Sequence, residues 1–166
     1  MNPAVVARAV LTRLKADTAL YSGGAWTSAL AGGASYNKGN PTSLTFPFVA
    51  YSVEWNGDNC FEGLEGRCDI TFTVYDEDAR GTDRIEYLID RIIGDATISS
   101  GTRTVPTFGL HNHALDLGAT GTGNTLGANS ERWTLERANI SPSDTMNVNQ
   151  ATLVFTGRVG NTAVNQ

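Results

Sequence analysis

The chain has 166 residues and a mass of 17.7 kDa, the size of a single domain. Its composition is 40% hydrophobic but only 17% charged, with 18 glycines, which argues against a coiled coil, a helical bundle or wholesale disorder. The 12 basic and 17 acidic residues give a net charge of −5, which disfavours general nucleic-acid binding because affinity for phosphate comes mainly from basic side chains.

The first element expected is an amphipathic helix of about four turns. Asn2 can cap it, Pro3 suits its first position, and it should end near Asp17 or Thr18. Its apolar stripe comprises Val6, Ala7, Val10, Leu11 and Leu14.

Residues 22–45 are expected to form a long loop, because repeated glycines interrupt any hydrophobic period. Loops of this length in small domains are usually functional or mobile. Trp26 and Tyr36 are the side chains expected to anchor it.

Two strands are expected next, Phe48–Trp55 and Cys68–Tyr75, each with an apolar face of alternate residues. They would form a β-hairpin whose tip, Asn56–Arg67, is a twelve-residue loop. Cys60 and Cys68 flank this tip, and pairing them directly would place the apolar residues of one strand opposite polar residues of the other. An odd-numbered register, or a bulge at Gly57, removes the mismatch, so free thiols are favoured over a disulfide.

A second amphipathic helix is predicted over Asp83–Ile93, with Thr82 as a possible cap and Gly94 ending it. After it, Val105–Leu117 is a plausible strand interrupted by Pro106, and residues 118–130 are expected to be a flexible loop. Two closing strands are predicted at 132–140 and 151–159, with a turn at 141–150 between them.

These elements predict an α+β fold in one domain, residues 1–160, followed by a flexible tail at 161–166. The expected order is α-β-β-α-β-β-β, with long Gly-rich loops. The sheet should be mostly antiparallel, with both helices packed on one of its faces, because each helix has only one apolar stripe.

Nothing in the sequence has the pattern of a membrane span of about 18 apolar residues. A signal peptide is also not expected, since Arg8, Arg13 and Lys15 interrupt the first twenty residues. We therefore expect the chain to be made and folded in a cytosol, from which it could enter a larger particle.

His111 and His113 are the strongest candidates for metal ligands, because residues at i and i+2 of a strand share a face. Asp116 is the nearest further ligand but would lie on the opposite face, so ordinary exposed or packing histidines are favoured. The glycines at 121, 123 and 127 resemble a phosphate-binding loop only superficially, because a strand and not a helix is expected after them.

The sequence gives little indication of catalytic carboxylates or of a catalytic nucleophile. Acidic residues at 62, 65 and 76–78 fall in polar loops and are more simply explained as solvated charges. No Gly-x-Ser-x-Gly motif occurs, and a serine triad would have to use one of the two histidines. We predict no catalytic residue, no cofactor-binding residue, no cofactor and no metal site.

The order of these segments has a known counterpart. The helix at 9–20 is followed by a Gly-rich loop, a strand entry Phe46-Pro47-Phe48-Val49, a strand at 66–76 that ends in an acidic turn, and the helix at 83–93. This order resembles the tail terminator (tail completion) proteins of long-tailed bacteriophages and related gene-transfer particles. The resemblance covers residues 1–95, and 130–160 only as generic strands, whereas 95–130 is longer and richer in glycine and threonine than expected.

The resemblance implies a non-enzymatic virion protein at the head-proximal end of the tail. Such proteins form a six-membered ring on the completed tail tube, stop tube polymerisation and provide the joining surface for the head connector or stopper protein. DNA passes through the ring without specific binding, which the acidic charge suits. The alternatives are another ring-forming virion component, a head–tail connector or a tail tube subunit, and less favourably a small hydrolase.

The hairpin tip is the predicted interface with neighbouring subunits or with the tail tube. Its length exceeds what a hairpin needs, and Phe61 and Leu64 lack an assignable partner within the subunit. A tip folded back to bury Phe61 in its own subunit is the alternative. The predicted interface residues are Asp58, Phe61, Glu62, Leu64, Glu65 and Arg67.

Overall fold

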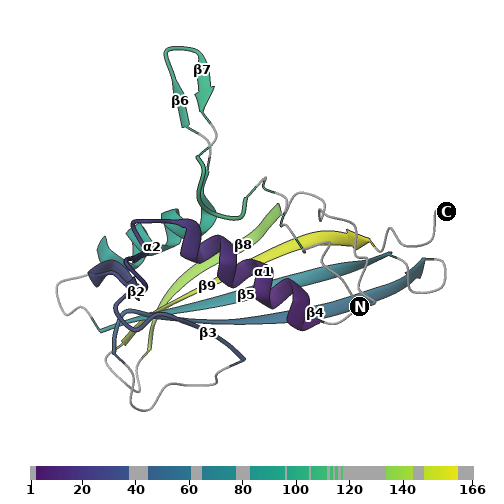
Figure 1. Ribbon diagram of the computed structural model, residues 1–166, viewed down its shortest axis with the longest axis horizontal. Coiled ribbons are helices and arrows are strands. Elements are labelled where there is room, and N and C mark those ends of the chain that lie inside the picture. Colours follow the sequence, from purple (N-terminus) through teal and green to yellow (C-terminus); the bar gives the residue numbers. More distant parts are fainter. Residues whose placement is uncertain are drawn as a thin grey trace.

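The computed structural model describes residues 3–37, 45–60, 65–77, 83–95, 97–104, 106–111, 113, 115, 117, 134–143 and 148–160. Their elements are α1 (Pro3–Ala16), β1 (Tyr21–Ser22), β2 (Ala25–Trp26), the 3-10 turn η1 (Ser28–Leu30), β3 (Ala34–Tyr36), β4 (Phe48–Cys60), β5 (Glu65–Asp76), α2 (Asp83–Ile93), β6 (Thr97–Ser99), β7 (Thr102–Thr104), β8 (Thr134–Ser143) and β9 (Val148–Gly160). Both helices lie on one face of a five-stranded sheet (Figure 1), which confirms the α+β class.

The main sheet has the strand order β3-β4-β5-β9-β8. All neighbouring pairs are antiparallel except β3 and β4, which are parallel. The largely antiparallel sheet is therefore confirmed. A pure loop over residues 22–45 is wrong, because its described part holds β1, β2, η1 and β3. The strand signal in β3 is only three residues long, too short to show a period between flanking glycines.

The core lies between the helices and the sheet. Helix α1 packs over β4, and α2 packs over β5 and β9. Both predicted stripes are confirmed as buried faces, with Val6, Val10 and Leu14 on α1 and Ile85, Leu88 and Ile92 on α2. Each such side chain contributes about 1.5–3 kcal/mol through removal of its apolar surface from water. A smaller buried cluster, Phe48, Ala50, Tyr75 and Val148, occupies the other face of the sheet.

Strands β4 and β5 pair in an odd-numbered register, with Tyr51 opposite Phe72 and Val53 opposite Ile70, as the apolar faces require. The register shifts between Asn56 and Cys60, the stretch that contains Gly57, where a bulge is the alternative to an odd-numbered register. Cys68 lies opposite Trp55, five positions from Cys60, and its thiol is free and buried. The preference against a disulfide is therefore confirmed at Cys68.

The twelve-residue tip is wrong. Cys60 pairs with Glu65, which leaves only residues 61–64 between the two strands and outside the described part of the chain. The physical reason is long-range pairing, because β9 accompanies β5 along its whole length, from Asp76 to Glu65. Local sequence, with three glycines between 57 and 66, gives no sign of this support.

The region after α2 departs most from expectation. A strand at Val105–Leu117 is wrong, since the described residues there are irregular apart from an isolated bridge at His111. Leu110, Leu115 and Leu117 are nevertheless buried in the core, so their spacing reflects packing of an irregular segment. The closing strands are confirmed and longer than predicted, so the turn between them shrinks to residues 144–147, which are not described.

Two carboxylates are buried among the described residues, and each is paired with an arginine. Asp17, which follows α1, accepts hydrogen bonds from the Ala19 backbone at 3.0 Å and from Arg91 Nε of α2 at 2.8 Å. Asp76 accepts from Arg84 Nε at 2.9 Å, which ties the end of β5 to the first turn of α2. These pairs fix both ends of α2 to the rest of the fold.

A buried tyrosine and a buried cysteine make the stability of the fold sensitive to high pH. The Tyr51 hydroxyl donates to the Ala7 carbonyl at 3.0 Å. Burial is the main cause that raises the pKa of Tyr51 to about 12, and the nearby Tyr36 is a smaller cause. Burial is likewise the main cause that raises the pKa of Cys68 to about 12, with a smaller effect from the negative charge of Asp69. Both groups stay protonated in the folded state after the unfolded chain has begun to release these protons.

We therefore expect the free energy of unfolding to fall above the ordinary pKa values of these groups, 9.0 for cysteine and 10.0 for tyrosine, until about pH 12. Each group contributes a slope of about 1.4 kcal/mol per pH unit within its own window. Urea unfolding of wild type, Tyr51→Phe and Cys68→Ala at a series of pH values measures this. In each variant, the slope of the free energy of unfolding against pH should be reduced by the contribution of the replaced group. Unchanged slopes would contradict the assignment of this pH dependence to Tyr51 and Cys68.

Candidate interaction surfaces

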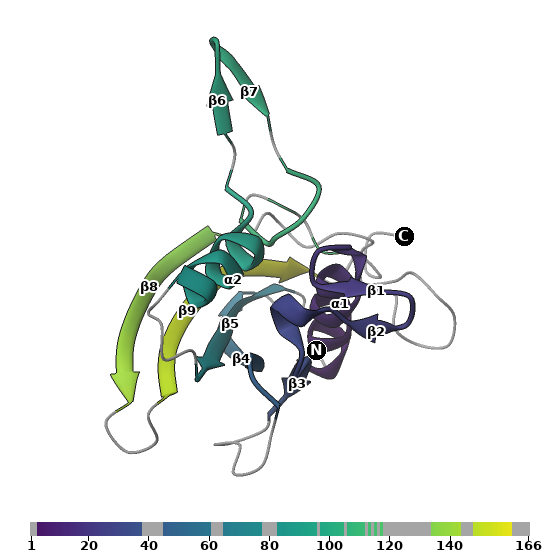
Figure 2. The same ribbon diagram turned by 90° about the vertical axis from the view of Figure 1, so that its left-hand side faces the viewer.

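A β-hairpin formed by β6 and β7 projects from the body of the molecule, and we call residues 97–104 the arm. It stands clear of the sheet and both helices in two perpendicular views (Figures 1 and 2). Thr97 pairs with Thr104 and Ser99 with Thr102, so the turn has two residues. Ser100 and Gly101 have φ values of 50° and 77°, and two consecutive positive φ angles match the type I′ turn typical of tight hairpins.

The arm buries none of its described side chains. Every residue of the arm whose exposure is described is exposed to solvent, Arg103 among them. A two-stranded hairpin by itself is at best marginally stable in water. The arm therefore lacks the hydrophobic support that the main sheet receives from the helices.

The base of the arm is a close contact between two backbone segments. Gly94 ends α2 with φ 66°, and Gly109, with φ 81°, lies where the chain returns from the arm. A Cβ on Gly109 would lie 2.4 Å from the Gly94 Cα, so neither position has room for a side chain. The backbone N–H groups of Leu110 and His111 donate to the Ile93 carbonyl at 3.1 and 2.8 Å.

Two arginines, one on each helix, contact the base of the arm. The Arg91 guanidinium lies over the Phe108 ring, 3.4 Å from its centroid, while it also donates to Asp17. The hydrogen bond to Asp17 raises the pKa of Arg91. Arg13 of α1 donates from Nε to the Gly109 carbonyl at 2.9 Å, and burial lowers the pKa of Arg13. The arm is thus anchored to both helices at its base.

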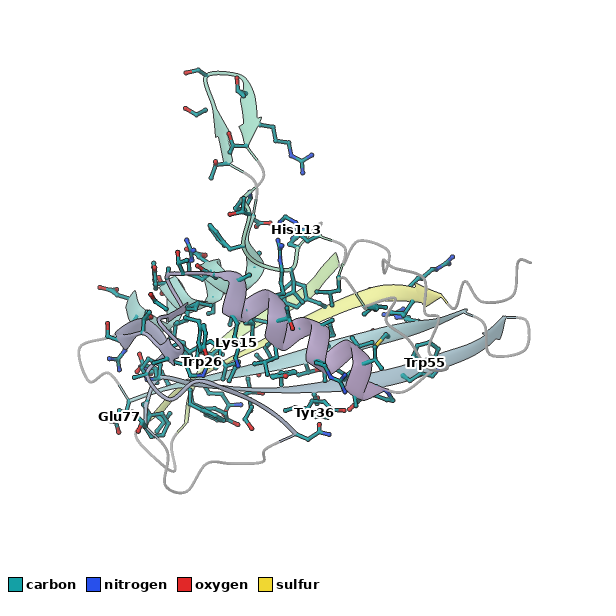
Figure 3. The ribbon with its side chains drawn as sticks, in the orientation of Figure 1. Lys15, Trp26, Tyr36, Trp55, Glu77 and His113 are labelled. Atoms are coloured by element: carbon teal, nitrogen blue, oxygen red, sulfur yellow. The ribbon has the colours of Figure 1, made fainter. Side chains whose placement is uncertain are left out.

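The two histidines lie beside this base and not on a shared strand face. His111 Nδ1 is 3.0 Å from Asp95 Oδ1. His113 is partly buried near the return from the arm (Figure 3), and its backbone N–H donates to the Leu110 carbonyl. The strand that would have aligned them is absent from the described residues, and Asp116 lies outside these. No group of three or more potential metal ligands occurs in the part of the chain that the structure describes.

The predicted tip residues are only partly described. Asp58 and Glu65 belong to β4 and β5, but their side chains, like Phe61, Glu62 and Leu64, lie outside the described residues. Arg67 is exposed on the sheet face opposite the helices, where its Nε donates to Thr156 Oγ1 at 2.9 Å. Trp55 and Glu77 mark opposite ends of the sheet (Figure 3), and the tip lies at the Trp55 end.

The arm is the surface feature that sequence reasoning missed. Its signal is present in Thr97–Thr104, where a Ser-Gly dipeptide lies between the short segments Thr-Ile-Ser and Thr-Arg-Thr. None of the helices within the described ranges is both long and apolar enough to cross a lipid bilayer.

Comparison with known proteins shows a shared fold. No protein-family model and no curated protein matches the chain. A solved structure described as the virion of a native gene transfer agent (GTA) particle contains a similar chain, with a TM-score of 0.52 and 18% sequence identity. The similarity covers 96% of this chain and 99% of the other. The α+β architecture described above is therefore also that of a virion component, over nearly the full length of both chains.

Proposed function

We propose that the chain is a structural virion protein that caps a tail tube as a six-membered ring. It would stop tube polymerisation and present a joining surface to the head connector or stopper protein. The observation that carries this proposal is the nearly full-length likeness to a chain of the gene transfer agent virion. The segment order, which resembles that of tail terminator proteins, supports the position at the head-proximal end of the tail.

The surface of the fold suits assembly into a ring. The sheet is covered by helices on one face, and β3 and β8 are its two outer strands among the described residues. The arm projects away from this body (Figure 2). A closed ring needs different, complementary patches on each subunit, and an arm and a strand edge are patches of that kind. Residues 1–160 would form the ring domain, and 161–166 would be a flexible tail.

The net charge of −5 suits passage of DNA through the ring. A lumen that repels phosphate lets the duplex slide, whereas a basic lumen would bind it. The proposed partners are thus five further copies of the chain, the tail tube protein and the connector, with no specific DNA contact, no enzymatic activity and no cofactor. Assembly would take place in the host cytoplasm.

The β4–β5 tip is the proposed contact with the tube or a neighbouring subunit. Changing Phe61→Ser together with Leu64→Ser should leave the thermal midpoint within a few degrees of wild type but abolish capping, giving overlong tubes. Electron microscopy of tube lengths and a thermal melt measure the two effects. The matched control is Tyr87→Ser on α2, which removes an exposed aromatic side chain outside the tip and the arm, and should cap normally. A stable double variant that caps normally would refute the tip contact, and an unfolded one would favour a tip packed within its own subunit.

A further inference from the structure

The arm is the described feature that packing within one subunit does not explain. Its turn has the backbone geometry of a tight hairpin, and its base is fixed by Gly94, Gly109 and the ring contact between Arg91 and Phe108. A segment that merely connected α2 to the following chain would not need this anchoring. The anchoring sets the direction of an exposed hairpin, which is useful if the hairpin meets something outside the subunit.

Among the described residues, the two strands of the arm pair only with each other, so each strand has an outer edge. In a two-residue hairpin the N–H of Thr102 bonds across the turn to Ser99, so Ser99 and Thr102 are a hydrogen-bonded pair. Such pairs alternate along an antiparallel ladder with pairs whose backbone groups point away from the partner strand. The N–H and C=O of Arg103 therefore point outward. Ile98, opposite Arg103, directs its own backbone groups outward from the other strand. Such groups pair readily with the edge of another sheet, a recognition mode that relies on main-chain hydrogen bonds.

The same chain offers a matching edge. Strand β8 is the outer strand of the five-stranded sheet, and its described residues pair only with β9. Its pairing with β9 is regular from Arg137 onward, whereas β3 at the other edge has only three residues. Pro142 lies near the end of β8, where it removes one donor and leaves the middle of the strand available.

Charge also favours a second copy as the partner. Arg103 is the sole charged residue in the sequence of the arm. Without it the chain has 11 basic and 17 acidic residues, a net charge of −6. A basic arm on an acidic body is attracted to the body of an identical subunit, and this attraction is directional because the arm is held at its base.

We propose that the arm of one subunit binds the next copy of the same chain by adding a strand to the outer edge of its β8. This rests on the proposed ring, whose subunit contacts it specifies. The contact is heterologous, with the arm on one side and β8 on the other, so each subunit both gives and receives an arm. Such a contact closes into a ring when the rotation per subunit fits.

Cysteine cross-linking tests the contact directly. In a Cys60→Ser background, Thr102→Cys, which keeps Arg103, is combined with Arg137→Cys, Asn139→Cys or Ser141→Cys, which sample the middle of β8. Paired strands bring opposite Cα atoms to about 4.5–5.5 Å, within reach of a disulfide. Oxidation of assembled tails should give a ladder of chains up to the ring size for at least one combination. Thr102→Cys with Ser35→Cys, on the β3 edge, is the matched control and should give at least tenfold less product.

Replacing residues 97–104 with a two-residue Gly-Ser link tests the consequence. This variant should keep its thermal midpoint within a few degrees, because the arm buries none of its described side chains, yet it should form no rings. Rings that persist without the arm but no longer join tubes or connectors would show that the arm binds another virion protein, and would overturn the inference. So would a ladder with Ser35→Cys in place of the β8 positions.

Different results would contradict the ring at the tail end and the contact between the arm and β8. If the chain is absent from tail ends, the proposed function is wrong. If it caps tails as a ring but none of the β8 combinations cross-links, only the arm contact is wrong. If the armless variant does not fold, the cross-linking ladder of the full-length chain still decides between the two results.

Discussion

Replacing Arg91 with alanine is expected to reduce the free energy of unfolding by about 3–5 kcal/mol. Asp17 is only 4% exposed, and Arg91 binds both of its carboxylate oxygens. The variant would leave this carboxylate buried, with the Ala19 backbone N–H as its hydrogen-bond donor. It would also remove the cation from the face of Phe108. Urea unfolding followed by circular dichroism measures the loss.

Two controls separate the buried charge from simple truncation. Arg8→Ala removes an exposed arginine from α1 and should change stability by no more than about 0.5 kcal/mol. The double change Asp17→Asn with Arg91→Met removes both charges, keeps an oxygen for the Ala19 N–H, and should recover most of the loss. A double variant as unstable as Arg91→Ala would show that packing, and not the unpaired carboxylate, sets the cost.

Replacing Gly109 with alanine is expected to destabilise the fold by about 3 kcal/mol. Part of the cost is the left-handed backbone, at about 1–2 kcal/mol for a residue with a Cβ. The remainder is overpacking at about 1–3 kcal/mol, because the new Cβ would lie 2.4 Å from Gly94 Cα and 2.6 Å from the Ile93 carbonyl oxygen. The contact between α2 and the returning chain must open to relieve it, and urea unfolding measures the effect.

Gly101→Ala is the matched control for Gly109→Ala. Gly101 has a similar φ of 77°, but a Cβ at this position would meet no atom within 4 Å. Gly101→Ala should therefore destabilise the hairpin by the cost of the left-handed backbone alone, about 1–2 kcal/mol. The free energy of global unfolding should change little, because the hairpin can open locally. Equal effects of the two substitutions on global stability would mean that the arm base is not a tight contact.

The helices and the central strands could be predicted from local pattern. The stripe at Ile85, Leu88 and Ile92, with Gly94 after it, specifies a helix and its end without tertiary information. The register of β4 with β5 also follows from sequence, since one buried face admits only registers that align the apolar residues of both strands, as Tyr51 aligns with Phe72. In these places local preference and the final packing agree.

The remainder depends on contacts between distant segments. Strand β3 exists because residues 34–36 lie beside β4, and the ends of β4 and β5 extend because β9 pairs along β5. The arm has only a short turn signal, in a segment with little apolar content. The extended pairing of β4 with β5 removes the argument from loop length for an interface at the tip. The proposed tip contact therefore rests on the apolar residues Phe61 and Leu64 in its sequence.

The proposed function places this chain in a six-membered ring on the head-proximal end of a tail tube. Electron microscopy of tails assembled with the wild-type chain, with averaging of the tail ends, tests it most directly. We expect extra density with six-fold symmetry at one end, tubes of uniform length, and overlong tubes when the chain is omitted. Density repeated along the whole tube, or tails that lack the chain yet have normal length, would contradict it.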